Sequence, residues 1–315
     1  MRLVYYGTPA AAVPPLEKLV TGGRAPLLVV TRADRPKGRG LATGCSAVHE
    51  AALAMDLPVA TPRKAGAPEE IDRVRALEPD LLLVVAYGQI LPRALLEVPK
   101  IGALNIHFSL LPLYRGASPV QAALLAGDPK TGVSAMWMTE GLDEGPVFEA
   151  IETPIEPFED AGALGARLAL LGADCLARAL DRIERGEREG RPQDGARSTY
   201  APKIAPDAGR LDLGLEAGEI ERRVRAYTPD PGAFFDTPSG RLTLLGAQAA
   251  PEEPGAAPGT VLGIDRERGL RIALARGSVW IATLKPSGRR AMSGRDFANG
   301  ARLRPGSSFL AAMSP

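Results

Sequence analysis

Apolar runs of strand length alternate with segments of helical spacing through the first half of the chain. The apolar runs cover residues 2–6, 26–31, 81–86, 103–108 and 132–138, and helical spacing lies between most of them, at 13–20, 46–55 and 118–127. Continuous apolar strands that alternate with helices are typical of a parallel sheet covered on both faces. The pattern therefore predicts an α/β domain with a doubly wound, mostly parallel sheet.

The pattern changes in the second half of the chain. Residues 160–186 have helical apolar spacing, whereas residues 186–209 lose it and fill with Gly, Pro and charged residues, which indicates a linker. One helical stretch at 215–227 is followed by four strand candidates, at 241–250, 259–265, 269–275 and 278–285. Their spacing predicts a small β-barrel. The expected organisation is a first domain at 1–188, a linker at 189–205 and a second domain at 206–315.

Charge and cysteine content narrow the class of protein. The 38 Lys and Arg stand against 37 Asp and Glu, so the formal net charge is +1 and any nucleic acid must bind a local patch. Cys45 and Cys175 lack a neighbouring Cys or His pair at ligand spacing, so no metal site is expected. No signal peptide or membrane-spanning run is apparent in the sequence, which favours a cytoplasmic protein without a membrane partner.

Two polar residues interrupt the apolar run at 103–108. The stretch NIHFS places Asn105 and His107 on the same face of a strand, and Ile106 on the other. Ligands of doubly wound sheets bind outside the carboxyl ends of the strands, which is where His107 lies. An Asn amide can donate to a developing oxyanion, and an imidazole can move a proton near neutral pH. The pair is therefore a candidate centre for acyl transfer.

Asp143 follows the next apolar run, in the sequence MTEGLDEG. The glycines on either side indicate a tight turn that can bring its carboxylate to the same rim, where it would favour a protonated imidazole and fix the ring's orientation. A simpler interpretation stays open: a single His at a strand end is usually satisfied by one hydrogen bond, and an Asp between glycines is usually a turn former. Ser109 lacks the G-x-S-x-G turn of a nucleophile, and YYGTP lacks the glycine pattern of a dinucleotide enzyme.

Basic residues gather in two regions. One is the Gly- and Pro-broken loop RADRPKGRG, with Arg35, Lys37 and Arg39. The other runs from Arg271 to the end of the chain, where Asp296 is the only acidic residue. Its eight basic residues are Arg271, Arg276, Lys285, Arg289, Arg290, Arg295, Arg302 and Arg304. Such runs are often solvated faces, yet segregated charge in a near-neutral protein can supply the phosphate contacts that dominate nucleic-acid affinity.

Several motifs together resemble the methionyl-tRNA formyltransferases, a family of folate-dependent formyl transfer enzymes. They are GTP after the first apolar run, DRPKGRG, VVAYGQILP, NIHFSLLPLYRG, GLDEG, TYAPKI and KPSGRRAM, and they extend through nearly the whole chain. The resemblance implies a Rossmann-like first domain and an OB-like second domain. It also implies 10-formyltetrahydrofolate as the cosubstrate, no metal, methionyl-initiator tRNA as the partner, and a monomer.

The same resemblance assigns roles to particular residues. Asn105, His107 and Asp143 match the catalytic Asn, His and Asp of the family. The folate-contacting residues would be Tyr87, Gly88, Ile90, Ser109, Leu110, Leu111 and Pro112. The tRNA-contacting residues would be Arg35, Lys37 and Arg39 at the acceptor stem, together with Lys285, Arg289 and Arg290. Phe108 departs from the family, which has a small Gly or Ala there, so its ring must narrow the folate pocket or point away from it.

Three alternatives remain at this stage. Glycinamide ribonucleotide formyltransferases share the Asn, His and Asp block but resemble only the first domain. Sugar-nucleotide formyltransferases carry an extra domain, but their small substrates give less need for the two basic regions. An RNA-binding protein without catalytic activity would explain the charge and leave Asn105, His107 and Asp143 without a role.

Overall fold

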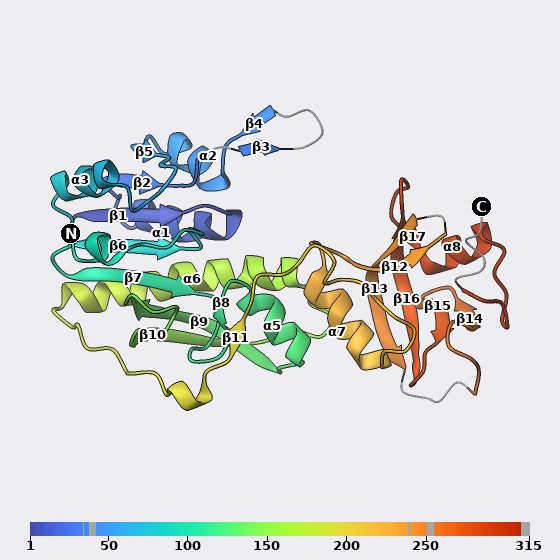
Figure 1. Ribbon diagram of the computed structural model, residues 1–315. Coiled ribbons are helices and arrows are strands. Elements are labelled where there is room, and N and C mark those ends of the chain that lie inside the picture. Colours follow the sequence, from blue (N-terminus) through green and yellow to red (C-terminus); the bar gives the residue numbers. More distant parts are fainter. Residues whose placement is uncertain (34, 38–41, 239, 251–254, 310–315) are drawn as a thin grey trace. The chain divides into compact units, whose positions relative to one another are not determined.

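The computed structural model describes residues 1–33, 35–37, 42–238, 240–250 and 255–309 (Figure 1). The chain divides into two compact units, each assembled from three segments. Unit 1 comprises Met1–Pro119, Lys130–Pro154 and Gly165–Pro202, and unit 2 comprises Val120–Pro129, Ile155–Leu164 and Lys203–Pro315. The units interleave along the sequence, and the domain limits expected above stay a prediction.

Unit 1 is built on a seven-stranded sheet. Its strands are β1 (Leu3–Gly7), β2 (Leu28–Val30), β5 (Val59–Ala60), β6 (Leu81–Val85), β7 (Gly102–His107), β9 (Lys130–Trp137) and β10 (Val147–Pro154). The order across the sheet is β10-β9-β7-β6-β1-β2-β5, and the strands from β7 to β5 are parallel. Every residue of β1 and β6 is buried, which explains their uninterrupted apolar sequences. The predicted doubly wound, mostly parallel sheet is confirmed.

The last two strands of this sheet differ from the simplest expectation. Strand β9, which contains most of the apolar run at 132–138, is antiparallel to β7, with Ser134 opposite His107. Strand β10 is antiparallel to β9 and was not predicted from the sequence. An apolar run indicates that a strand is buried on both faces, but it does not indicate the direction of the strand in the sheet.

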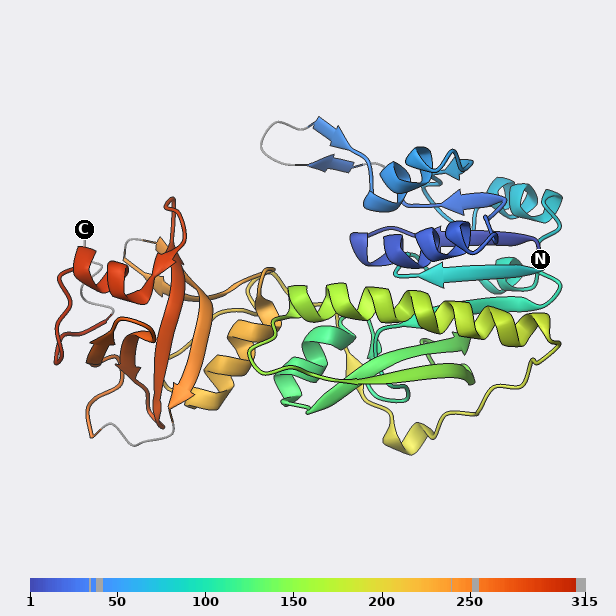
Figure 2. The same ribbon diagram turned by 180° about the vertical axis from the view of Figure 1, so that it is seen from behind.

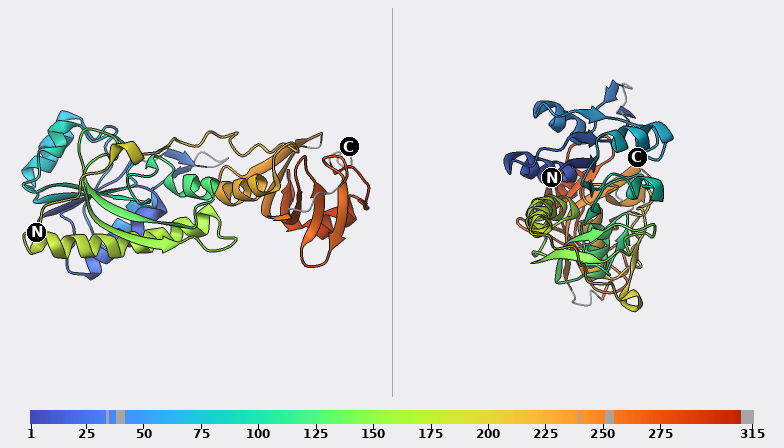
Figure 3. Two further views of the ribbon diagram at one scale, coloured as in Figure 1. Left: turned by 90° about the horizontal axis from the view of Figure 1, so that it is seen from below. Right: turned by 90° about the vertical axis from the view of Figure 1, so that its left-hand side faces the viewer.

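Helices cover both faces of the sheet. They are α1 (Val13–Thr21), α2 (Ala47–Ala54), α3 (Pro68–Ala76), α4 (Arg93–Leu96) and the long α6 (Ala161–Glu184), with short 3-10 turns η1 (Ala10–Ala12) and η2 (Gly195–Arg197). Figures 2 and 3 show α1 and α6 on one face, where Lys18 of α1 forms an ion pair with Asp174 of α6. Residues of α3 and α4 join the apolar core on the other face. Two small strand pairs, β3 (Arg35–Lys37) with β4 (Ala42–Gly44) and β8 (Arg115–Gly116) with β11 (Tyr200–Ala201), lie outside the main sheet.

Unit 2 contains an antiparallel sheet, as expected. Its strands are β12 (Ala233–Thr237), β13 (Gly240–Ala250), β14 (Val261–Asp265), β15 (Gly269–Ala273), β16 (Ser278–Pro286) and β17 (Met292–Ser293), and its helices are α5 (Pro119–Ala126), α7 (Ala217–Tyr227) and α8 (Gly294–Gly300). The described strands pair in the order β12-β13-β16-β15-β14, with β17 on β16. Helices α7 and α8 pack on the buried face of this sheet through Ile220, Val224 and Phe297. The four strand candidates and the helix at 215–227 are confirmed, whereas β12, β17 and α8 were not anticipated.

No helix in the described ranges is both long enough and apolar enough to span a membrane.

Candidate active site

A cavity of about 630 Å³ opens at the carboxyl ends of the parallel strands of unit 1. It lies where the strand order reverses, because β2 and β6 flank β1 on opposite sides. Its lining comes from the residues that follow β1 and β6, from the end of β7, from the loop at 138–143, and from Met136, Tyr200 and three residues at 116–119. This is the usual ligand position in doubly wound sheets, and the volume falls within the usual range for small-molecule sites.

Asn105 and His107 lie at the inner wall of this cavity. Both belong to β7, and both are largely buried, with 9% and 6% of their surfaces exposed. Because side chains alternate along a strand, the amide and the imidazole share one face, as predicted. Burial of two polar side chains beside a cavity is costly unless they form hydrogen bonds there, which favours a role toward a ligand.

Both ring nitrogens of His107 face oxygen atoms. Nε2 lies 2.9 Å from the carbonyl oxygen of Tyr114, and a carbonyl only accepts, so Nε2 carries the hydrogen and donates. Nδ1 lies 3.6 Å from Oδ2 of Asp143, which is the distance of an ion pair and longer than a hydrogen bond. The ring therefore donates from Nε2 to the Tyr114 carbonyl and turns Nδ1 toward the Asp143 carboxylate.

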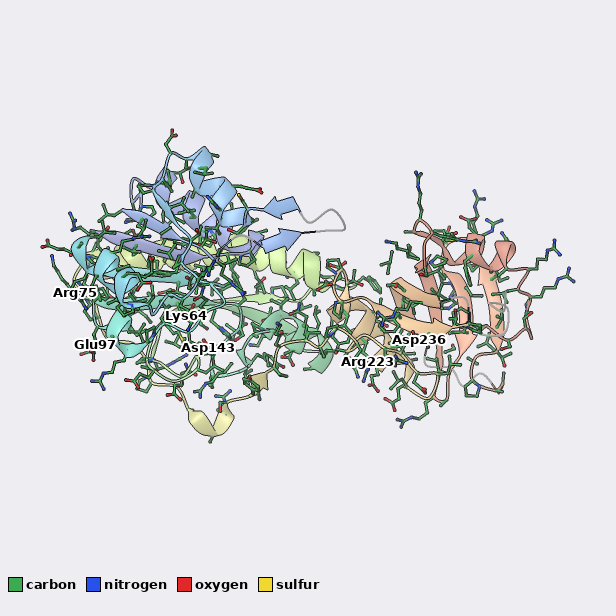
Figure 4. All side chains as sticks on the ribbon, turned by 45° about the horizontal axis from the view of Figure 1, so that its top comes forward. Lys64, Arg75, Glu97, Asp143, Arg223 and Asp236 are labelled. Atoms are coloured by element: carbon green, nitrogen blue, oxygen red, sulfur yellow. The ribbon has the colours of Figure 1, made fainter. Side chains whose placement is uncertain are left out.

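Asp143 reaches His107 by a route that the sequence analysis did not foresee. Because β9 is antiparallel to β7, its carboxyl end lies at the opposite edge of the sheet, where the amide of Met138 donates to Ala103. The loop at 138–146 then carries Asp143, which is labelled in Figure 4, back to the lining of the cavity. The backbone of Asp143 is in the left-handed region, with φ 50°, and its Oδ2 accepts a 2.8 Å hydrogen bond from the amide of Gly116. The expected partner is therefore correct, although the strand-end reasoning behind it was wrong.

Gly145 is required at the end of this loop. A Cβ atom at that position would collide with the carbonyl oxygen of Trp137, so the chain can return toward β10 only with glycine there. The motif GLDEG thus fixes the path of the loop as well as supplying its carboxylate.

The expected folate-contacting residues fall into two groups. Tyr87, Gly88 and Ile90 line the cavity, and Ile90 is 88% exposed at its mouth. Burial raises the pKa of Tyr87 to about 12, and its hydroxyl has no hydrogen-bond partner among the described residues. A cavity lined by an exposed apolar side chain and a buried aromatic residue is suited to a flat heterocycle.

The second group, Ser109 to Pro112, does not line this cavity. Ser109 is fully buried, and its hydroxyl donates to the carbonyl oxygen of Leu113 at 2.6 Å. The hydroxyl of Ser134 donates to the carbonyl oxygen of Ser109 and accepts from the amide of Leu111. These contacts hold the turn after β7 in place, and a direct folate contact for Ser109, Leu110, Leu111 and Pro112 stays a prediction.

Phe108 lines the cavity together with Asn105 and His107. Its ring packs toward Gly172 of α6, where an added Cβ atom would lie only 3.2 Å from Phe108 Cε1 and 3.2 Å from Ile106 Cγ2. The absence of a side chain at Gly172 therefore leaves room for the bulky ring. This contact explains how the chain accommodates Phe at a position where a smaller residue was expected.

The expected tRNA-contacting residues are placed only in part. Arg35 and Lys37 belong to β3, and Arg39 lies outside the described residues. Lys285, Arg289 and Arg290 are exposed at the end of β16 and in the turn that follows it. Their contact with RNA stays a prediction.

Several residues that line the cavity were not anticipated from the sequence, and two of them are largely exposed. Leu142 and Tyr200 line the cavity with more than half of each side chain exposed. Their motifs, GLDEG and TYAPKI, had been noted, but exposure of a large apolar or aromatic side chain is visible only in the fold. Within the described ranges, no three His, Cys, Asp or Glu side chains gather as metal ligands would.

Comparison with known proteins agrees with this architecture. The sequence profile of the formyl transferase family matches residues 1–180, and that of the formyl transferase C-terminal domain matches residues 203–302. The methionyl-tRNA formyltransferase of Halorhodospira halophila is 45% identical over 97% of this chain and 98% of its own. That of Symbiobacterium thermophilum is 40% identical over 100% of this chain and 97% of its own.

A solved structure has the same fold at low sequence identity. HypX from Aquifex aeolicus, in complex with tetrahydrofolic acid, superposes with a TM-score of 0.64 at 19% identity, over 95% of this chain and 47% of that one. This chain thus corresponds to about half of HypX. From the matched profiles and the full-length relatives, the chain belongs to the formyl transferase family.

Proposed function

We propose that this protein transfers the formyl group of 10-formyltetrahydrofolate to the α-amino group of methionyl-initiator tRNA. The observation that carries the proposal is the convergence of Asn105, His107 and Asp143 at one wall of the cavity. The names of the full-length relatives support the acceptor, and tetrahydrofolic acid bound to HypX supports the donor.

The reaction needs an oxyanion site more than it needs a nucleophilic side chain. The methionyl amine attacks the formyl carbon, the carbonyl oxygen becomes negative, and the bond from that carbon to N10 of the folate then breaks. The amine loses a proton and N10 gains one, so the products are formylmethionyl-tRNA and tetrahydrofolate. The substrate amine is itself the nucleophile, so no covalent intermediate with the protein is needed.

Asn105 and His107 are suited to stabilise the negative oxygen. The Asn105 amide offers N–H donors toward the cavity, and the imidazolium of His107 places a positive charge beside it. Nε2 must leave the carbonyl of Tyr114 to donate directly to the oxyanion, whereas the charge acts from its present position. Asp143 balances that charge and holds the ring in place.

The exposed basic residues of unit 2 favour a polyanionic acceptor. Lys285, Arg289 and Arg290 offer charges suited to tRNA phosphates, whereas a sugar nucleotide or a small ribotide needs far fewer such contacts. The expectations of a monomer and of a cytoplasmic location stay predictions.

A competition among acceptors tests the proposal. The purified protein, supplied with 10-formyltetrahydrofolate, is offered methionyl-initiator tRNA, an aminated dTDP sugar or glycinamide ribonucleotide. We expect formyl transfer to the tRNA alone, with an affinity that falls steeply as salt rises. Transfer to one of the small acceptors in place of the tRNA would contradict the proposed substrate.

A further inference from the structure

The segment expected to be a linker forms hydrogen bonds with Asp143 and with Tyr114, whose carbonyl oxygen faces His107. Within unit 1, its strand β11 pairs in parallel with β8, and the amide of Ala117 donates to the carbonyl of Ala201. Two side chains of the segment, Gln193 and Thr199, form further hydrogen bonds next to the cavity. Residues 189–205 are rich in Gly, Pro and charge, which indicated a linker. The segment instead packs against the candidate active site.

Gln193 holds the loop that carries Asp143. Its amide nitrogen donates to two backbone carbonyls of that loop, those of Asp143 at 2.8 Å and of Gly145 at 2.7 Å. Its amide oxygen accepts from Nε and Nη2 of Arg115, at 3.1 Å and 2.8 Å. The guanidinium thus fixes the orientation of the amide, with oxygen toward Arg115 and nitrogen toward the loop.

The loop needs such support because of its conformation. Asp143 is a non-glycine residue at φ 50°, a conformation that costs free energy and persists only where surrounding contacts enforce it. The Gly116 amide holds the carboxylate, and Gln193 holds the backbone carbonyl of the same residue. Together they restrain the position of Oδ2 relative to Nδ1 of His107.

Thr199 acts on the other side of the imidazole. Its hydroxyl oxygen accepts a 2.8 Å hydrogen bond from the amide of Tyr114, whose carbonyl accepts from Nε2 of His107. The amide of Arg115 donates to the carbonyl of Thr199 at 2.9 Å. The same segment therefore positions the oxygen atoms that face both ring nitrogens.

We propose that Gln193 is a positioning residue for formyl transfer, which acts by holding the loop so that the Asp143 carboxylate stays beside His107. The inference rests on the proposed function for its kinetic effect. Its structural effect is independent of the substrate, because it concerns only the surroundings of the imidazole.

The test compares three variants of the full-length protein. Gln193→Leu keeps a similar volume but loses the amide, and Gln193→Glu keeps an acceptor for Arg115 but loses the donor to the loop. The matched control is Asp194→Ala, because Asp194 is exposed and caps its own turn through the amide of Ala196. We expect both Gln193 variants to lower kcat about tenfold or more, with KM for the folate nearly unchanged, and the control to keep its kcat.

A second readout does not depend on activity. The chain has two histidines, His49 and His107, so ¹⁵N resonances of the rings can be assigned with a His49→Gln variant. We expect Gln193→Leu and Gln193→Glu to shift the ring resonances of His107 and to leave those of His49 in place. Unchanged His107 resonances with unchanged kcat in either folded variant would overturn the inference. If the unmodified protein shows no formyl transfer, while the Gln193 variants still shift the His107 resonances, the proposed function is contradicted and the positioning role of Gln193 is not.

Discussion

Oδ2 of Asp143 lies 3.6 Å from Nδ1 of His107, although the loop that carries Asp143 leaves the sheet at the opposite edge. The pairing depends on the return of that loop and on its hydrogen bond from Gly116. Both groups are mostly buried, which weakens the screening of their charges by water. The carboxylate therefore acts on the imidazole more strongly than an exposed partner would.

Replacement of Asp143 by Asn tests this charge. The Asn side chain keeps an oxygen for the amide of Gly116 but loses the negative charge that faces His107. We expect kcat for formyl transfer to fall about 100-fold, while the melting temperature stays within a few degrees of the original. Steady-state kinetics and thermal unfolding of the original protein and of Asp143→Asn measure both quantities. A kcat of the variant within twofold of the original would contradict a role for the ion pair.

The contact between Phe108 and Gly172 predicts a coupled effect on stability. Gly172→Val would push its side chain into Phe108 and Ile106, so we expect the free energy of unfolding to fall by about 1–3 kcal/mol. In a Phe108→Ala background the same substitution should cost less, because the ring is gone. Urea unfolding of the four proteins of the cycle measures the coupling.

Gly165 provides the control in the same helix. A Cβ atom there would meet nothing within 4 Å, so Gly165→Val should be nearly neutral or stabilising. Equal losses at positions 165 and 172 would show that the Phe108 ring does not decide the result.

The buried thiol gives a chemical prediction. Cys175 is fully buried in α6, and burial raises the pKa of its thiol to about 12, with a further contribution from the charge of Glu149. The reactive thiolate is therefore scarce at pH 8, and reagent cannot reach it. In a Cys45→Ser variant, we expect a thiol reagent to modify nothing in the native protein and one thiol after unfolding. Rapid native modification would contradict the burial of Cys175.

The sequence predicted the parts of the fold that local pattern encodes. Periodicity located β1, β6 and β7 and the helices α1, α2 and α5, because buried strands and amphipathic helices differ in their apolar spacing. It could not give the direction of β9, which depends on how the chain crosses the sheet. The same limit led to the neighbour of His107, Asp143, by an argument that placed its strand end at the wrong edge of the sheet.

Site prediction failed where contacts are distant in sequence. Gln193 is separated from Asp143 by 50 positions, and it lies in a segment whose composition indicates a linker. No local pattern marks such a side chain as part of a site. The position of the Phe108 ring could not be predicted from the sequence either, since the space that the ring occupies exists because residue 172 of α6 is a glycine.

The basic residues of unit 2 predict a change in salt dependence. Arg289→Ala combined with Arg290→Ala should weaken binding of methionyl-tRNA and reduce the slope of log affinity against log salt by about one to two. A matched control is Arg75→Ala, because Arg75 is an exposed arginine of α3 paired with Asp72 (Figure 4). Filter binding at several salt concentrations measures both. An unchanged slope in the double variant would place the phosphate contacts elsewhere.

The most direct test of the formyl-transfer centre is the single-turnover rate of Asn105→Ala with saturating 10-formyltetrahydrofolate and methionyl-initiator tRNA. Loss of one oxyanion donor typically costs about 100-fold or more, so we expect a fall of that size while the dissociation constants of both substrates change little. A near-normal rate in the folded variant would contradict the role of Asn105 and, with it, the assignment of this cavity as the formyl-transfer centre.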